Sequence, residues 1–349
     1  LFATEPGRGA PASINFVSCH DGFTLTDLTR YRSKHNEANG ENNNDGSSVN
    51  HSANFGVEGV TDDPDVIAAR EQAAMNMIGM LLLSLGTPMM LAGDEFRNTQ
   101  DGNNNAYCQD NDITWLKWDW MYSTNKTREM RRLETVSRLV ALRKSLDLYH
   151  HEDFFTRLTQ IGLLKPSSRV QWFLPDGTTP MERDWFDLGV RSFTMRLLSN
   201  SEVDVCIVVN GTADDRTFRL PPDTHWTPKW CSAEINGRRA GHGTQVEECD
   251  LNGDTTVWTQ HVPDASETVL KMVKEVAMQR TESSTENEAD TIKFAMPVTD
   301  HAANGTSSAP RDEVSADMPD APVDDTPDTP VDDNVWTMPA LSITLMKQV

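Results

Sequence analysis

The order of apolar segments between residues 14 and 146 constrains the fold most. Two short apolar runs, INFVSC at residues 14–19 and PMMLA at residues 88–92, are each followed along the chain by a longer segment with helical periodicity. Short buried runs that alternate with helices are typical of parallel α/β units. The sequence therefore predicts an α/β fold for this part of the chain, in the order strand, helix, strand, helix.

The two helical segments carry start and stop signals. Asp63 can cap the first helix, Pro64 fits its first turn, and Gly86 can end it. Its apolar stretch, residues 75–85, is too short and too interrupted by polar residues to span a membrane. The second helix is predicted over residues 127–146, where apolar residues recur at helical spacing.

Strand-like runs dominate the chain after residue 150. The runs VQWFLP, SFTMRLL, DVCIVVN and RTFRLP are separated by short turn sequences rich in Asp, Asn, Ser and Gly. Such spacing is typical of an antiparallel β-sandwich, which we expect over residues 151–280. Residues 336–349 recover strand character and are predicted to form the last strand of that sandwich.

An acidic segment separates these two β-rich parts. Residues 281–335 hold fourteen acidic residues against Lys293 and Arg311, and the segment is rich in Ser, Thr and Pro. A segment of this composition cannot bury enough apolar surface to fold. The sequence therefore predicts a disordered acidic insertion before the last strand.

Composition restricts the partners and the compartment. A chain of 349 residues with a formal net charge of −22 is not suited to nucleic acid or to an anionic membrane. Its five cysteines are scattered and form no C-x-x-C pair, so neither a zinc site nor a disulfide framework is indicated. We expect reduced thiols in a cytoplasmic protein, and no cofactor.

Carboxylates follow both predicted strands. Asp21 comes directly after the first strand, and Asp94 and Glu95 follow the second. In parallel α/β barrels, reactive side chains lie just beyond the carboxyl ends of the strands, and glycoside hydrolysis requires paired carboxylates. The plainer alternative is that the first strand reaches the surface in an ordinary His-Asp-Gly turn.

Asparagine-rich loops follow the same strands. Residues 36–54 and residues 101–111, the latter with Asn103, Asn104 and Asn105, supply amide groups suited to sugar hydroxyls. Three nearby tryptophans could either pack internally or stack on a sugar ring. The stretch ENNNDG superficially resembles a calcium loop but lacks the acidic twelfth ligand, so no metal site is predicted.

Four motifs carry a family resemblance. INFVSCHDGFTL, KHNEANGENNNDG, LLLSLGTPMMLAGDEF and GNNNAYCQDN, in this order, resemble bacterial glycogen debranching enzymes of the isoamylase type, which belong to the α-amylase superfamily of retaining glycoside hydrolases. The resemblance runs from residue 1 to about residue 146 and extends to a C-terminal β-domain. It implies the last two βα units of a TIM-type (β/α)8 barrel, with strand seven at residues 14–19 and strand eight at residues 88–92.

The resemblance also implies roles for individual residues. His20 would bind sugar hydroxyls, and Asp21 would be the catalytic residue that stabilises the oxocarbenium-like transition state. Asn103, Asn104 and Asn105 remain candidate substrate-binding residues. The implied substrate is a branched α-glucan, either glycogen or limit dextrin, cleaved at its α-1,6 branch linkages.

Two departures from the family pattern limit this interpretation. The superfamily's nucleophilic Asp and acid Glu lie on strands four and five, which would precede residue 1, and no matching motif occurs in this chain. Arg97 stands where relatives usually have glycine. Glu95 is a candidate replacement acid, but the resemblance implies that its position belongs to the scaffold of strand eight. We therefore expect residues 1–150 to be the C-terminal part of a catalytic barrel that is inactive alone. The alternatives are a non-catalytic carbohydrate-binding protein or an inactive gene fragment.

Overall fold

The computed structural model describes residues 9–149, 170–198, 204–222, 225–242, 247–248, 334–339 and 342–348. All of them belong to one compact unit, Leu1–Leu270 with Val331–Val349. The predicted acidic insertion lies outside the described residues up to residue 333, as do the residues next to the predicted boundary at 150. Both predictions therefore remain predictions.

The two long helices begin where the sequence predicts. The helix α2 spans Pro64–Leu83, and Asp63 caps it by accepting a hydrogen bond from the Asp65 amide at 3.0 Å. The helix α3 spans Arg128–Ser145, capped by the Thr127 hydroxyl. A short helix, α1, spans Leu25–Leu28. The 3-10 helices are Ala10–Ala12 (η1), Glu37–Asn39 (η2), Asp94–Phe96 (η3), Ala106–Cys108 (η4), Asp119–Tyr122 (η5), Asp147–Tyr149 (η6), Glu182–Trp185 (η7) and Ser232–Asn236 (η8).

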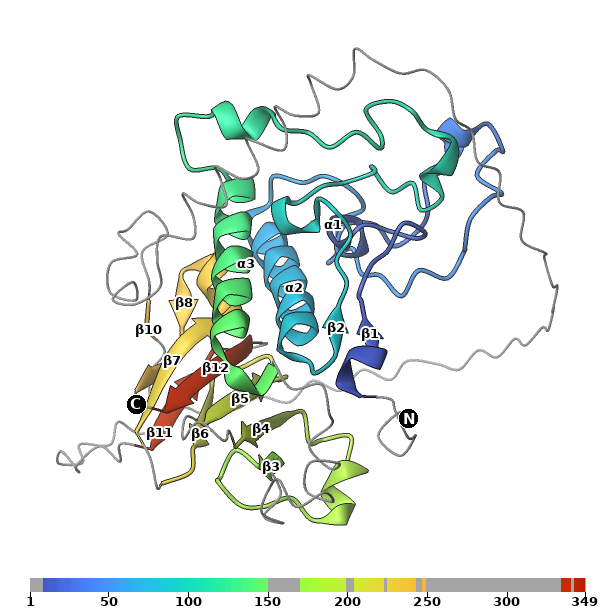
Figure 1. The fold of residues 1–349 in the computed structure, drawn as a ribbon. Coiled ribbons are helices and arrows are strands. Elements are labelled where there is room, and N and C mark those ends of the chain that lie inside the picture. Colours follow the sequence, from blue (N-terminus) through green and yellow to red (C-terminus); the bar gives the residue numbers. More distant parts are fainter. Residues whose placement is uncertain are drawn as a thin grey trace, which may run out of the picture. The chain divides into compact units, whose positions relative to one another are not determined.

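The helix α2 is long enough and apolar enough to cross a bilayer by length and composition alone. Its apolar residues nevertheless pack inside the protein, because Met75, Ile78 and Leu82 are at most 4% exposed and contact α3 and a β-sheet. Figure 1 shows α2 and α3 side by side. The helix therefore has the environment of a core helix.

The two predicted parallel strands exist but are short. The strand β1, Ile14–Asn15, pairs in parallel with β2, Thr87–Pro88. The expectation of a buried strand over residues 14–19 is wrong, because the side chains of Ile14 and Phe16 are 60% and 54% exposed. The physical reason is the lack of neighbours: among the described residues, β1 and β2 pair only with each other.

The later part of the chain forms antiparallel sheets, as predicted. One sheet has the strand order β3-β4-β5-β12-β7, a second has the order β6-β11-β9, and β8 pairs with β10. The bounds are Val170–Phe173 (β3), Ser192–Leu197 (β4), Val205–Asn210 (β5), Arg216–Arg219 (β6), Trp226–Cys231 (β7), Arg238–Arg239 (β8), Gly241–His242 (β9), Glu247–Glu248 (β10), Val335–Met338 (β11) and Ser342–Gln348 (β12).

The five-stranded sheet is apolar on both faces. Side chains alternate between faces along a strand, and in β5 Val205 and Ile207 join the cluster that contains α2 and α3. Cys206 and Val208 join a second cluster, which includes Phe218 of β6 and Met338 of β11. One face therefore packs against the helices, and the other face shares a core with strands of the three-stranded sheet.

The end of the chain differs from its prediction. Residues 336–349 were expected to form one strand, but β11 and β12 are separate strands in different sheets. Pro339 follows β11 directly, and proline has no N–H to donate to a β-ladder. A local apolar pattern does not reveal this change of sheet.

Candidate functional site

His20 and Asp21 lie in an exposed turn beyond β1. Their side chains are 86% and 79% exposed, and the His20 Nε2 atom lies 3.5 Å from an Asp21 carboxylate oxygen. The residues on either side of the turn are anchored, because Ser18 and Phe23 are buried. The turn therefore presents an imidazole and a carboxylate outward from a fixed base.

The structure brings this turn next to the second asparagine-rich loop. Gly22, which has a positive φ of 90°, donates its backbone N–H to the Asn104 carbonyl oxygen at 3.0 Å. The Cys19 thiol donates to the Asp21 carbonyl oxygen at 3.3 Å. Two segments more than 80 residues apart in sequence thus form one surface, as their position after neighbouring strands predicts.

Asn103, Asn104 and Asn105 hold the two asparagine-rich loops together. The Asn104 side chain is 4% exposed, donates to Asn50 Oδ1 at 2.6 Å and accepts from Asn36 Nδ2 at 2.9 Å. Asn103 donates to Asn39 Oδ1, and Asn105 donates to an Asp45 carboxylate oxygen. The side chains of all three predicted residues therefore have hydrogen-bond partners within the protein, which the sequence did not indicate.

Gly46 makes this loop contact possible. A Cβ atom at this position would lie 2.4 Å from Asn104 Oδ1 and 2.7 Å from Asn36 Nδ2, and the φ angle of Gly46 is +70°. Any side chain would therefore separate the loops and would also strain the backbone.

The two carboxylates after β2 differ from Asp21. Asp94 is 1% exposed, and its side chain accepts hydrogen bonds from the Ser18 hydroxyl and from the Leu25 amide, the latter at 2.9 Å. Burial raises the pKa of Asp94, and it also raises the pKa of Glu95, whose carboxylate accepts from the Gly93 amide at 2.9 Å. Through these hydrogen bonds, Asp94 connects η3 to the base of the turn and to α1.

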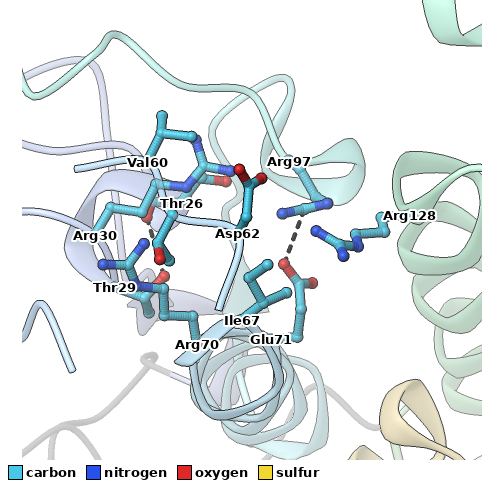
Figure 2. Close-up of a pocket in the computed structure, with 11 residues that line it drawn as sticks. Thr26, Thr29, Arg30, Val60, Asp62, Ile67, Arg70, Glu71, Arg97 and Arg128 are labelled. Carbon is cyan, nitrogen blue, oxygen red and sulfur yellow. Dashed lines mark hydrogen bonds and ion pairs between the residues drawn. The ribbon is translucent and has the colours of Figure 1, made fainter. Parts of the chain in front are cut away.

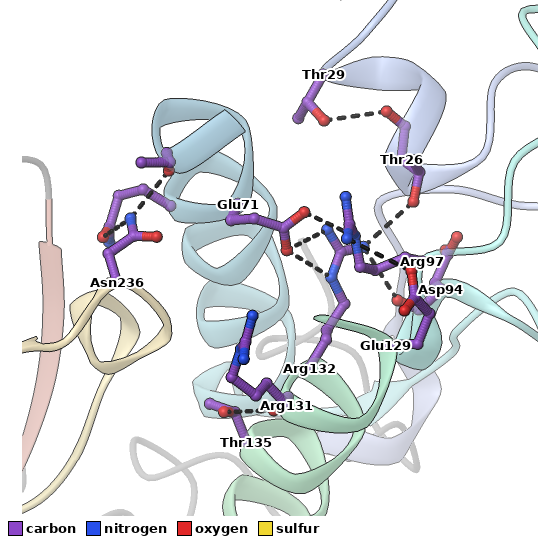
Figure 3. A network of polar contacts seen from close by, with 12 residues as sticks. Thr26, Thr29, Glu71, Asp94, Arg97, Glu129, Arg131, Arg132, Thr135 and Asn236 are labelled. Atoms are coloured by element: carbon purple, nitrogen blue, oxygen red, sulfur yellow. Dashed lines mark hydrogen bonds and ion pairs between the residues drawn. The ribbon is translucent and has the colours of Figure 1, made fainter. Parts of the chain in front are cut away.

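Glu71 is the centre of a buried ionic network that sequence inspection missed. Its carboxylate accepts from Arg132 Nη2 at 2.8 Å and lies 2.8 Å from Arg97 Nε (Figure 3). Arg132 is 1% exposed and also donates to the Thr26 hydroxyl at 3.2 Å and to the Asp94 carbonyl oxygen. The network joins α1, α2, η3 and α3. Spacing along each helix gives no signal for it, because the partners lie on different elements.

Arg97 occupies a backbone position that favours glycine. Its φ angle is 70°, in the left-handed region, which agrees with the expectation that relatives have glycine at this position. Its guanidinium pairs with Glu71 and lies 3.4 Å from Glu129. We infer that the ion pairs offset the cost of the backbone conformation.

Two of the three tryptophans after the second asparagine-rich loop pack against another aromatic side chain. The rings of Trp118 and Trp120 lie 4.8 Å and 5.4 Å from the Phe96 ring between centroids. Trp115 is 55% exposed, and its indole N–H donates to Asp110 at 3.0 Å. Of the three residues, Trp115 alone keeps a largely exposed ring.

Cysteines and other possible metal ligands form no site in the part of the chain that the structure describes. Four of the five cysteines fall there, and no disulfide joins any two of them. No group of three or more His, Cys, Asp or Glu side chains among the described residues could hold a metal ion.

Curated bacterial proteins align with a large part of this chain. A protein of Mycobacterium tuberculosis named glycogen operon protein GlgX homolog is 45% identical over 190 residues, which are 54% of this chain. The glycogen debranching enzyme of Pectobacterium atrosepticum is 38% identical over 242 residues, or 69% of this chain. This chain is homologous to bacterial glycogen debranching enzymes.

The homology to debranching enzymes covers only part of each relative. The chain spans 26% of the Mycobacterium protein and 34% of the Pectobacterium enzyme. No protein-family model matches. Among solved structures, a pullulanase from Bacillus acidopullulyticus is 19% identical over 62% of this chain and 20% of its own, with a TM-score of 0.38, which is too low to establish a shared fold.

Proposed function

We propose that a polypeptide containing this chain hydrolyses the α-1,6 branch linkages of glycogen or a similar branched α-glucan. The observation that carries the proposal is the homology of this chain to proteins named glycogen debranching enzyme. The proposed protein acts in the cytoplasm and needs neither nucleic acid nor a membrane as a partner.

In this proposal, His20 and Asp21 contact the sugar ring at the bond that is cleaved. Their exposure and their position beyond a parallel strand support this assignment. Positive charge grows on the ring in an oxocarbenium-like transition state, and a nearby carboxylate stabilises that charge. Asp21 is therefore the proposed catalytic residue, and His20 binds hydroxyl groups.

The asparagines fit a supporting role better than direct contact. The side chains of Asn103, Asn104 and Asn105 already form hydrogen bonds within the protein. Direct binding of sugar hydroxyls by these residues stays a prediction. The hydrogen bond from Gly22 to Asn104 instead supports a role in fixing the turn that carries His20 and Asp21.

The proposed fold places β1 and β2 as the seventh and eighth strands of a (β/α)8 barrel, followed by a β-sandwich. The parallel pairing of β1 with β2 supports this placement, as does the exposure of Ile14 and Phe16. A two-stranded sheet with exposed apolar side chains is unstable alone. We propose that further strands of a longer polypeptide cover these side chains.

The test is a hydrolysis assay with the natural polypeptide that contains this chain. Glycogen is the substrate, linear amylose is the control, and the products are separated by chain length. We expect linear malto-oligosaccharides from glycogen and no cleavage of amylose. Cleavage of amylose at a comparable rate, or no release of chains from glycogen by a folded polypeptide, contradicts the proposal.

A further inference from the structure

A pocket of about 220 Å³ lies between the three helices, apart from the exposed turn. Its walls come from α1, from the segment before α2, from α2 itself, from the loop after η3 and from the start of α3. Figure 2 shows Arg97 and Arg128 on one side of Glu71, with Arg30 and Arg70 on the other. Four arginines therefore line one small pocket, and they come from four different segments.

The positive charge of the pocket is only partly balanced within the described part of the chain. The lining contains two carboxylates, Asp62 and Glu71, and Glu71 is already shared by Arg97 and Arg132 at 2.8 Å each. Glu129, which is not a lining residue, lies 3.4 Å from Arg97 and balances part of its charge. Neither Arg30 nor Arg128 forms an ion pair or a side-chain hydrogen bond with another described residue. A pocket with excess positive charge stands out in a chain of net charge −22.

Arg70 adds a buried guanidinium group to the pocket wall. The residue is 5% exposed, and its terminal nitrogens donate to the Gly59 carbonyl at 2.6 Å, the Asn54 carbonyl at 2.8 Å and the Val57 carbonyl. Its Nε atom is buried and has no hydrogen-bond partner. The three carbonyl acceptors hold the Arg70 guanidinium in place, so Arg70 contributes a fixed positive charge to the pocket wall.

Repulsion between the arginine side chains also favours a bound anion. Burial, followed by the charge of Arg30, lowers the pKa of Arg70. Burial also lowers the pKa of Arg97 to about 10, against the opposing effect of Glu71. An anion in the pocket would relieve the repulsion between these guanidinium groups.

We propose that this pocket binds a phosphate group, either as the free ion or on a phosphorylated sugar of monosaccharide size. Arginine forks pair with phosphate oxygens through two parallel hydrogen bonds. A tetrahedral phosphate can accept donors from several directions, as arginines on different walls require, whereas a planar carboxylate suits a single fork. The volume is below the roughly 300–1,000 Å³ of pockets for drug-sized ligands, so the ligand is small.

The experiment is calorimetric titration of the 349-residue chain at constant ionic strength. The probes are inorganic phosphate, a hexose monophosphate and the unphosphorylated hexose. We expect saturable binding of phosphate and no binding of the hexose. Tighter binding of the hexose monophosphate identifies a sugar phosphate as the ligand, and equal binding identifies the ion.

Variants separate a specific site from general charge effects. Arg30→Gln and Arg128→Gln leave the ion pairs of Glu71 intact, and each is expected to weaken binding at least about tenfold, because each removes a charge-assisted contact. Arg183→Gln removes the same charge from a side chain that is 80% exposed and outside the pocket, and it should change binding less than about twofold.

Arg30→Lys keeps the protein's charge but loses the fork, so intermediate binding is expected, and this variant also guards against misfolding of Arg30→Gln. The proposal is overturned if phosphate shows no saturable binding. It is equally overturned if binding survives the combined Arg30→Gln and Arg128→Gln substitutions. Because the readout is binding, a failure here leaves the proposed hydrolase function untouched.

Discussion

At the residue scale, burial separates carboxylates that look equivalent in the sequence. Asp21 and Asp94 both follow a predicted strand, but Asp21 has a 79% exposed side chain, whereas Asp94 is 1% exposed and hydrogen-bonded to Ser18 and Leu25. A side chain that already has buried partners holds the fold together. Asp21 is the carboxylate that remains available to a ligand.

The first residue-scale prediction concerns Asp21→Asn in an enzyme with a complete active site. We expect kcat on branched glucan to fall about 100-fold, because the amide keeps the shape but loses the charge that stabilises the transition state. KM should change less than about threefold, since the lost interaction belongs to the transition state. Steady-state kinetics measures both.

His20→Ala is the companion variant, and it should raise KM as well, because hydroxyl contacts form before the ring distorts. Thermal unfolding provides the control: both side chains are exposed, so neither substitution should lower the midpoint. An early unfolding midpoint, or an unchanged kcat for Asp21→Asn, shows that the turn is an ordinary surface feature.

A second residue-scale prediction concerns pH. Partial burial opposes ionisation of Glu58, but hydrogen bonds from the Arg32 and Ser33 amides and from Asn54 prevail and lower its pKa to about 2. A depressed carboxylate stabilises the fold above its unfolded pKa of 4.5, and this stability is lost as pH falls toward about 2. The side chain is 36% exposed, so solvent screening limits the contribution to about 1 kcal/mol.

Chemical denaturation between pH 6 and pH 3 measures this contribution. The gap in unfolding free energy between the unmodified chain and Glu58→Gln should narrow below about pH 4.5. Glu41→Gln, at an exposed position in the first asparagine-rich loop, serves as the control and should show no such narrowing. A gap for Glu58→Gln that stays constant across this pH range refutes the prediction.

At the element scale, the helices were predictable and the strands only in part. Caps such as Asp63 and Thr127 act within a few residues, so the starts of α2 and α3 could be predicted from local sequence. Strand length depends on partners elsewhere in the chain, and β1 covers two residues of the expected six. The same limit explains why the division of the end of the chain into β11 and β12 was missed.

The candidate site, too, could be predicted from the sequence only in part. His20–Asp21 and the second asparagine-rich loop follow two consecutive predicted strands, and the hydrogen bond from Gly22 to Asn104 joins them. It did not reveal that Asn103 and Asn104 are buried, because composition cannot show which amides face a neighbouring loop. The Glu71 network was missed for the same reason.

The element-scale prediction is that Asn104 holds the two loops together. Asn104→Ala leaves the donors and acceptors of Asn36 and Asn50 without this partner, and it should cost about 1–3 kcal/mol. Hydrogen exchange should accelerate at Gly22, whose N–H bonds to Asn104. Exchange measured by mass spectrometry, together with chemical denaturation, tests both effects.

Asn44→Ala is the matched control. Asn44 is exposed and donates only to the nearby Glu41 carbonyl at 3.0 Å, so its removal should change stability by less than about 0.5 kcal/mol. Equal effects of the two alanine substitutions would mean that the asparagine contacts do not determine the loop structure.

At the scale of the whole molecule, the homology and the exposed apolar strand support the same proposal, that this chain works as part of a longer polypeptide. The chain spans about a third or less of the relatives it matches, and Ile14 and Phe16 expose large apolar side chains beside a two-stranded sheet. Both observations support the proposal that this chain supplies a turn that contacts the substrate, together with the loops that hold the turn. In this proposal, the nucleophile and the general acid belong to other parts of a longer polypeptide.

The most direct measurement of this claim uses a chimera of the Mycobacterium tuberculosis relative, in which the 190 aligned residues are replaced by those of this chain. Release of linear chains from glycogen is compared for the chimera, the parent and the isolated 349-residue chain. We predict chimera activity within about tenfold of the parent, or about 1.4 kcal/mol in activation free energy, and none for the isolated chain. A folded but inactive chimera contradicts the account. So does hydrolysis by the isolated chain that Glu95→Gln abolishes, since Glu95 would then be the general acid.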